Sequence, residues 1–158
     1  MHHLSTSKTV WARLVLTSFA VILLACNASQ PVSAAEMTMY KDPNCGCCGA
    51  WATHLQNKGF TVTQKLSNDM DQVKATHGVP AELASCHTAI IDGYIIEGHV
   101  PAADIKRLLK ERPPIAGLTA PGMPMRSPGM QAEGLPPQGY DVLSFDKQGH
   151  SKVYKSYR

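Results

Sequence analysis

Apolar and polar positions along the chain follow two periods, which together predict an α/β protein. Short alternating, β-branched or aromatic runs predict six strands, over residues 37–40, 60–66, 88–91, 94–96, 140–145 and 152–157. Apolar residues three or four positions apart, between capping and stop residues, predict three helices, from Asn44 to Gly59, from Ser67 or Asn68 to Gly78, and from Pro101 to Pro113. Because strands separated by helices need parallel crossovers, the β-α-β-α-β-β-α order predicts a mixed sheet with helices on its faces.

Turn and loop residues organise the second half of the chain. Asp92-Gly93 adopts positive φ at low cost, which predicts a two-residue hairpin between the third and fourth strands. Residues 113–139 contain seven prolines and five glycines without an apolar period, so they are expected to form a Pro/Gly/Met-rich loop. We therefore expect one domain over residues 36–112, against which residues 113–158 pack as this loop and a C-terminal β-hairpin.

The first 35 residues are predicted to be a signal peptide. Their apolar run, residues 14–25, follows two basic residues and is short for a membrane span. Small residues at positions 32–35 suit cleavage by signal peptidase, whereas residues 23–26 resemble a lipoprotein box. We expect a periplasmic protein, with membrane attachment only if Cys26 is lipidated.

Composition narrows the range of partners. The formal charge of the whole chain is +3, and loss of Lys8 and Arg13 with the signal peptide leaves 13 basic against 12 acidic residues. A nearly neutral protein without a basic patch is not expected to bind nucleic acid. Four of the five cysteines remain after cleavage, and crowded thiols in an oxidising compartment persist only when they hold metal or cycle catalytically.

Three cysteines stand where the first strand is predicted to pass into the first helix. Cys45 and Cys48 form a Cys-x-x-Cys pair with Cys47 inside it, and the free N–H groups of a helix start favour thiolates. We expect the adjacent side chains of Cys47 and Cys48 to diverge, which disfavours one tetrahedral zinc ion. Thiolates that bridge several Cu(I) ions need no such closure, so the cluster predicts a multinuclear copper site.

Other soft or nitrogen ligands lie further along the chain. Cys86, followed by His87, offers a fourth thiolate, the alternative being a buried cysteine beside a surface histidine. His99, in a loop fixed by glycine and proline, is either a copper ligand or a packing residue. His54 and His77 have no ligand partner at useful spacing and are expected at the surface.

The proline-rich loop contributes methionines outside any hydrophobic period. Met123 and Met130 are predicted as auxiliary Cu(I) ligands, because thioethers are soft and cannot be lost to disulfides. The alternative is that they pack the loop onto the domain, which we favour for Met125.

Three separated motifs occur in a fixed order along the chain. The motifs are Tyr40-Lys41-Asp42-Pro43 with the Cys-Gly-Cys-Cys cluster, Glu97-Gly98-His99-Val100-Pro101-Ala102, and Gly117-Leu118 leading into Pro121-Gly122-Met123-Pro124 and Ser127-Pro128-Gly129-Met130. Together they resemble the CopG-type proteins of bacterial copper-resistance operons, long classed as a domain of unknown function. The resemblance implies a thioredoxin-like fold, an exported role in copper resistance, and a thiolate-bridged copper cluster that interconverts Cu(I) and Cu(II). It also implies directly that Cys45, Cys47 and Cys48 are ligands of this cluster.

These observations predict a copper-binding protein that sequesters, transfers or oxidises Cu(I), with other periplasmic copper carriers or exporters as partners. Redox turnover, as in a copper oxidoreductase, rests on the resemblance alone. One alternative is a thiol-disulfide oxidoreductase in which Cys45 is the nucleophile and Cys48 the resolving thiol. Another is a structural zinc module, which suits the number of cysteines and leaves the methionines without a purpose.

Overall fold

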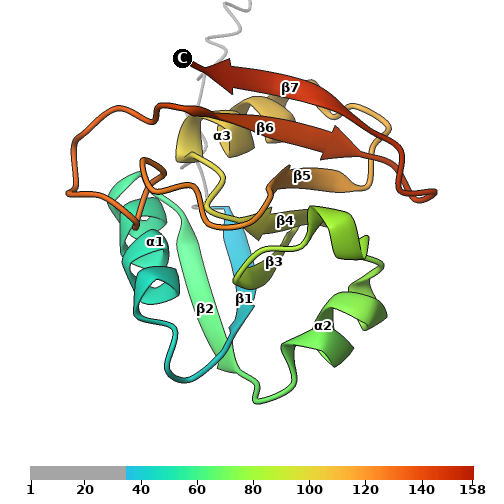
Figure 1. The fold of residues 1–158 in the computed structure, drawn as a ribbon, viewed down its shortest axis with the longest axis horizontal. Helices are drawn as coiled ribbons and strands as arrows, with labels where there is room; N and C mark the ends of the chain where they lie inside the picture. Colours follow the sequence, from blue (N-terminus) through green and yellow to red (C-terminus); the bar gives the residue numbers. More distant parts are fainter. Residues whose placement is uncertain (1–34) are drawn as a thin grey trace, which may run out of the picture. The chain divides into compact units, whose positions relative to one another are not determined.

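Seven strands form one mixed sheet in the computed structural model, which describes residues 35–158. The strands are β1 (Glu36–Lys41), β2 (Thr61–Leu66), β3 (His87–Ile91), β4 (Tyr94–Gly98), β5 (Gly117–Ala120), β6 (Tyr140–Phe145) and β7 (Ser151–Tyr157). The helices are α1 (Gly46–Asn57), α2 (Met70–His77) and α3 (Ala102–Glu111), with a 3₁₀ turn at Ala81–Leu83. The sheet order is β2-β1-β3-β4-β5-β6-β7 (Figure 1), with the β1–β2 and β4–β5 pairs parallel and the others antiparallel. The predicted mixed α/β sheet is confirmed.

Two sequence predictions concern residues that the structure does not describe. The predicted signal peptide, residues 1–35, lies outside the described residues except for Ala35, and so does the lipidation alternative at Cys26. Within residues 35–158, no helix has the length and apolar character needed to span a membrane. The thioredoxin-like assignment within the α/β class stays a prediction.

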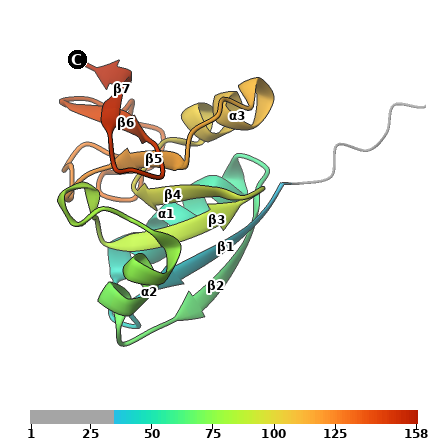
Figure 2. The same ribbon diagram turned by 90° about the vertical axis from the view of Figure 1, so that its right-hand side faces the viewer.

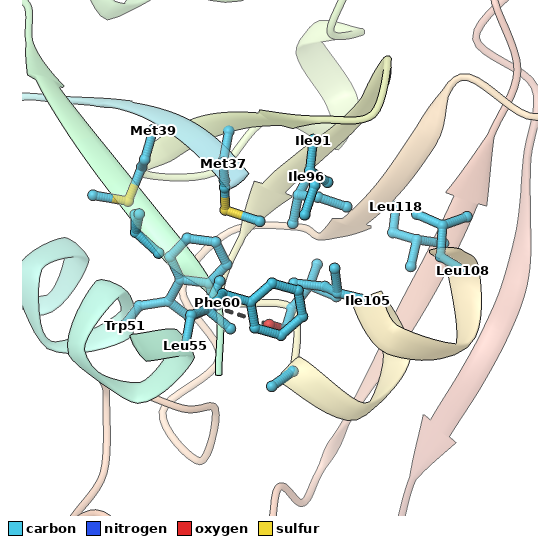
Figure 3. Close-up of a cluster of buried hydrophobic side chains, with 14 of the residues drawn as sticks. Met37, Met39, Trp51, Leu55, Phe60, Ile91, Ile96, Ile105, Leu108 and Leu118 are labelled. Carbon is cyan, nitrogen blue, oxygen red and sulfur yellow. Dashed lines mark hydrogen bonds between the residues drawn. The ribbon is translucent and has the colours of Figure 1, made fainter. Parts of the chain in front are cut away.

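The main core lies between the sheet and helices α1 and α3. Met37 and Met39 alternate along β1 toward this face, where they meet Trp51 and Leu55 of α1. Ile105 of α3 belongs to the same buried cluster, whose side chains Figure 3 shows. Helices α1 and α3 therefore cover one face of the sheet.

Helix α2 lies on the opposite face, as Figure 2 shows. The ring of Tyr40, which alternates with the buried Met39 on β1, lies 5.3 Å from the ring of His77 on α2. Lys74 of the same helix donates to Thr88 Oγ1 (3.1 Å). No residue of α2 is fully buried, so polar contacts and partly buried side chains hold this helix.

Helix starts differ from the predicted caps by one or two residues. Cys45, not Asn44, is the N-cap of α1, because the Asn44 N–H is taken up by Asp42 Oδ1 (2.7 Å) in the preceding turn. Asp69 caps α2 in place of Ser67 or Asn68, and its N–H bonds to Ser67 Oγ (3.1 Å). The first correction places a cysteine at the position where helix N–H groups are free.

The predicted loop over residues 113–139 contains a strand that the prediction missed. β5 has only four residues, all buried, and it pairs with β4 on one side and β6 on the other. A strand buried on both faces shows no alternation, so the hydrophobic period could not reveal it. The Asp92-Gly93 hairpin and the C-terminal hairpin are both confirmed, the first with positive φ at both turn residues (48° and 83°).

Candidate metal centre

The first turn of α1 carries three cysteines. After β1 ends at Lys41, a turn in which Cys45 N–H donates to Asp42 O (3.1 Å) delivers Cys45 to the helix start. Cys48 is fully buried beneath the helix, whereas Cys45 and Cys47 are partly exposed. Because the first N–H groups of α1 lack helical partners, negative charge on sulfur is favoured here.

Two of these cysteines are joined. Cys45 and Cys48 form a disulfide, and Cys47 Sγ lies 3.6 Å from Cys45 Sγ. Cys47 and Cys86 are free. Pairing is the expected fate of crowded thiols that hold no metal, and reduction of this one bond releases two sulfurs, so that all four are then available for coordination.

The four sulfur atoms converge. Cys86 lies in the loop that enters β3, and its carbonyl oxygen is 3.8 Å from Cys48 Sγ. The Sγ atoms of Cys45, Cys47, Cys48 and Cys86 all lie within 4.8 Å of one another. Since side chains tilt toward the N-terminus of a helix, cysteines of the first turn meet there.

This convergence corrects one sequence expectation. Cys47 and Cys48 do not diverge as predicted, because both sulfurs lean toward the start of α1 and face Cys86. Four thiolates around one tetrahedral zinc ion require sulfur separations of about 3.8 Å, which small adjustments can reach from this arrangement. The positions of these cysteine sulfurs alone therefore do not exclude a site that holds a single metal ion.

A second group of ligand atoms shares Cys86. One ligand atom each of Cys86, His87 and His99 lies within 4.8 Å of the other two. Cys86 Sγ is 3.0 Å from His99 Nε2 and 3.4 Å from His87 Nδ1. The thiol of Cys86 therefore stands between the sulfur group and two imidazoles.

The hydrogen bond behind His99 fixes its protonation. His99 Nδ1 lies 2.6 Å from Pro128 O, and a carbonyl oxygen can only accept, so Nδ1 carries the proton. The lone pair of the neutral ring is then on Nε2, which faces Cys86. A carbonyl that orients an imidazole from behind is the usual arrangement behind a histidine metal ligand.

His87 is the ligand candidate that the predicted site lacked. Its side chain is completely buried, which makes the surface-histidine alternative wrong, and its ring lies 4.3 Å from that of Trp51. His87 Nε2 has no hydrogen-bond partner within residues 35–158. The signal was present in the sequence, because His87 continues the inward alternation of Ala89 and Ile91 on β3.

Burial sets the protonation of the metal-free centre. It lowers the pKa of both His87 and His99, so both rings are neutral near pH 7 and able to bind metal. Burial, reinforced by the nearby Cys47 sulfur, raises the pKa of the Cys86 thiol to about 11. A metal ion that binds Cys86 must therefore displace its proton.

Acid is expected to destabilise the metal-free protein. Because the pKa values of His87 and His99 are lowered in the folded state, the unfolded chain takes up protons on these two histidines at a higher pH than the folded chain does. The free energy of unfolding should therefore decrease from about pH 7.5 to about pH 5.5, measured by chemical denaturation. His99→Gln should reduce the difference and His77→Gln should not. Equal stability at both pH values would contradict this account.

A buried carboxylate supports the Cys86 loop from behind. Glu97 is fully buried, and its Oε1 accepts from Lys74 Nζ and from Ser85 N–H, both at 2.6 Å. Its Oε2 accepts from Thr88 Oγ1 (2.7 Å). Burial raises the pKa of Glu97, while Lys74 opposes that change. In the sequence, Glu97 stands out only as part of a family motif, and its supporting role was not predicted.

Removing this carboxylate is expected to loosen the centre. Glu97→Ala leaves Lys74 and the Ser85 N–H without their buried partner, which should cost about 3 kcal/mol of folding free energy. Glu97→Gln keeps an acceptor for Ser85 and should cost less. Chemical denaturation measures the stability, and the rate of thiol labelling at Cys86 should rise in the alanine variant. Unchanged labelling and stability would show that the carboxylate does not position this loop.

A glycine of the proline-rich loop packs against the start of α1, next to the centre. Gly129 has φ +85°, and a Cβ there would lie 2.6 Å from Trp51 N and 2.9 Å from Cys47 O. The backbone of Gly129 therefore lies beside the start of α1, and Met130, which follows it, is partly buried. On the other side of the centre, Gly122 N donates to Ala84 O (3.0 Å), two residues before Cys86.

The remaining predicted residues fall into two sets. The structure places Cys45, Cys47, Cys48 and Cys86 in one group of converging ligand atoms and Cys86, His87 and His99 in a second, while metal binding by these residues stays a prediction. Met123 follows Gly122 at the rim and is 59% exposed, so metal binding by Met123 and Met130 stays a prediction. His54 lies 3.4 Å from Glu133, and neither His54 nor His77 belongs to the groups of converging ligand atoms in the described part of the chain.

Comparison with known proteins identifies the family. A family model described as a protein of unknown function, DUF411, matches residues 83–130, which include Cys86, His87 and His99. No curated protein matches the chain. Two solved structures, described as forms 1 and 2 of copper resistance protein CopG, are similar to it. They share 44% and 43% sequence identity with TM-scores of 0.72 and 0.73.

The match extends over the full length of those proteins. It covers 78% and 79% of this chain and 98% and 99% of theirs. At this identity and coverage, and with the cysteine cluster in place, a metal-binding role in copper resistance is supported. The chain therefore belongs to the CopG family of copper resistance proteins.

Proposed function

We propose that the protein holds several Cu(I) ions in a thiolate-bridged centre and protects the periplasm from copper. The ligands are the sulfurs of Cys45, Cys47, Cys48 and Cys86 with the imidazole of His99, and His87 as a further nitrogen ligand. Met130 serves as an auxiliary thioether ligand from the loop, and Met123 as one that is needed only while copper enters the centre. The comparisons support a metal-binding role in copper resistance. The proposal adds the oxidation state of the copper, the number of ions and the compartment.

The position of Cys86 between two ligand groups carries the proposal. Its sulfur lies within 4.8 Å of three other sulfurs and also within 4.8 Å of a nitrogen of each of two imidazoles. Six ligand atoms exceed what one tetrahedral ion accepts, whereas a bridging thiolate lets two groups hold separate ions. This arrangement supports more than one ion per chain.

The chemistry of the ligands favours Cu(I). Thiolates and neutral imidazoles are soft or borderline ligands, and Cu(I) accepts low coordination numbers that partly buried sulfurs can supply. The buried, neutral His87 ring offers Nδ1, which lies 3.4 Å from Cys86 Sγ, as a further nitrogen ligand. Hard cations such as Mg²⁺ or Ca²⁺ find no carboxylate oxygen in either group of the described residues.

Loading the centre requires reduction of the Cys45–Cys48 disulfide. The bond takes up two electrons and two protons to give two thiols, and Cu(I) then displaces the protons. Two Cu(II) ions that accept one electron each from the two thiolates would become two Cu(I) ions as the disulfide forms again, so Cu(I)/Cu(II) interconversion at the same sulfurs is part of the proposal. In the periplasm, the reductant and the copper would come from other exported carriers or exporters.

Anaerobic metal analysis tests the proposal. Protein without the predicted signal peptide is reduced, titrated with Cu(I) and separated from free copper. The wild-type chain should retain more than one copper per chain, and Cys47→Ser should retain fewer. A single copper per chain would overturn the multinuclear centre. Equal retention of Zn²⁺ under the same conditions would favour a structural zinc module instead.

One observation favours a second function, thiol-disulfide exchange. The Cys45–Cys48 disulfide sits at a helix N-terminus with Cys45 partly exposed, which suits a nucleophilic thiol. An insulin-reduction assay with metal-free protein distinguishes the two functions. Robust turnover that survives Cys47→Ser would favour exchange, whereas turnover that is absent, with tight copper binding, favours the metal centre.

A further inference from the structure

A segment of the loop is fastened to the candidate metal centre at both ends. At its start, Gly122 O accepts a hydrogen bond from Ser85 Oγ, the residue before Cys86. At its end, Pro128 O accepts the His99 Nδ1 proton (2.6 Å). We call residues 122–128 the methionine strap, and its two anchors attach it to the neighbour of Cys86 at one end and to His99 at the other.

The strap presents two thioethers to solvent. Met123 and Met125 are 59% and 70% exposed, two of five large hydrophobic side chains exposed in the described residues. Both the N–H and the Oγ–H of the buried Ser127 donate to Pro124 O, at 3.0 and 2.6 Å, which fixes a turn with Met125 at its corner. Exposure of this degree means that packing onto the domain does not explain either methionine.

The spacing of the two methionines suits one soft ion. A single proline separates them, so their Cα atoms lie at most about 7 Å apart. Methionine side chains are unbranched and flexible, so both Sδ atoms can turn to the same point. Neutral thioethers select Cu(I) over harder divalent ions and, unlike the Cys86 thiol, have no proton to lose.

We propose that Met123 and Met125 form a surface Cu(I) capture site that passes the ion to the buried centre. This inference rests on the proposed function, and it names the route by which copper reaches the buried centre. Transfer is a ligand exchange in which copper–thioether bonds break as copper–thiolate bonds form. The accepting thiol releases its proton to water, and no electron moves.

Rapid-mixing kinetics tests the capture site. Cu(I) is supplied as a weak chelator complex to reduced wild-type protein and to the Met123→Leu/Met125→Leu double variant. Leucine conserves volume, and the sites are exposed, so the fold should be unaffected. The double variant should take up copper about tenfold more slowly and reach the same final stoichiometry. Met70→Leu, on the opposite face of the sheet, should behave like wild type.

The outcomes separate the two proposals. An uptake rate in the double variant equal to that of wild type overturns the capture site and leaves the centre intact. A lower final stoichiometry at an unchanged initial rate overturns it too, because the methionines would then be resting ligands. Absence of Cu(I) uptake by the wild-type protein refutes the proposed function itself.

Binding at the strap can also be observed directly. With methyl-labelled methionine and substoichiometric Ag(I) as a redox-inert probe for Cu(I), the Met123 and Met125 methyl resonances should shift in the oxidised, disulfide-containing protein. The Met70 resonance should not move. Shifts that spare Met123 and Met125 would remove the capture site.

Discussion

Cys86→Ser protein is expected to bind Cu(I) at least about 100-fold more weakly than the wild-type chain and at lower stoichiometry. Within the described residues, Cys86 Sγ is the ligand atom common to the sulfur group and the histidine group. Serine occupies nearly the same volume, but its hydroxyl is a hard, protonated ligand that Cu(I) binds poorly. Competition with a coloured Cu(I) chelator under anaerobic conditions measures both quantities.

A matched control distinguishes lost coordination from lost structure. His77→Gln removes a potential ligand outside the centre and should leave copper binding unchanged. The stability of the metal-free Cys86→Ser chain should stay close to that of wild type, because the Cys86 thiol is only partly buried. Wild-type affinity and stoichiometry in Cys86→Ser would show that the two ligand groups are not linked through this sulfur.

Trp51→Ala is expected to produce the largest loss of stability. Trp51 is fully buried, its Nε1–H donates to Val100 O (2.9 Å), and its ring packs on His87. Removing so large a side chain from a close-packed core costs about 3–5 kcal/mol. For a domain of this size, the melting temperature should fall by about 10–20 °C.

The measurement must use circular dichroism, since Trp51 is the sole tryptophan outside the predicted signal peptide. Trp51→Phe serves as the control. It keeps an aromatic ring against His87, loses the hydrogen bond to Val100, and should cost clearly less than the alanine variant. A Trp51→Ala protein that melts within a few degrees of wild type would mean that this ring does not anchor α1 and the loop.

The strands and helices with a regular hydrophobic period could be predicted, and elements buried on all sides could not. The Asp92-Gly93 turn and β6 (Tyr140–Phe145) were predicted because turn chemistry and alternation are local properties. β5 (Gly117–Ala120) escaped because its four residues are buried between two neighbours, a property of the whole sheet. A Cβ on Gly117 would collide with the Ile95 backbone, a contact equally invisible in sequence.

The residues of the candidate site also divide into those that could be predicted from the sequence and those that could not. The Cys45, Cys47 and Cys48 cluster was evident from spacing, and Cys86 and His99 from their residue types beside element ends. His87 was underestimated because the predicted strand began at Thr88, so the inward alternation of Ala89 and Ile91 was not extended back to it. The convergence of Cys47 and Cys48 was missed because the prediction considered adjacent positions and not the common tilt of side chains at a helix start.

X-ray absorption of the reduced, anaerobically loaded protein tests the central claim most directly. It reports the oxidation state, the ligand atoms and the presence of neighbouring metals in one experiment. The account predicts a Cu(I) edge, a first shell dominated by sulfur at about 2.3 Å, and a short copper–copper vector from thiolate bridging. A spectrum of Cu(II) bound only by nitrogen and oxygen would contradict it.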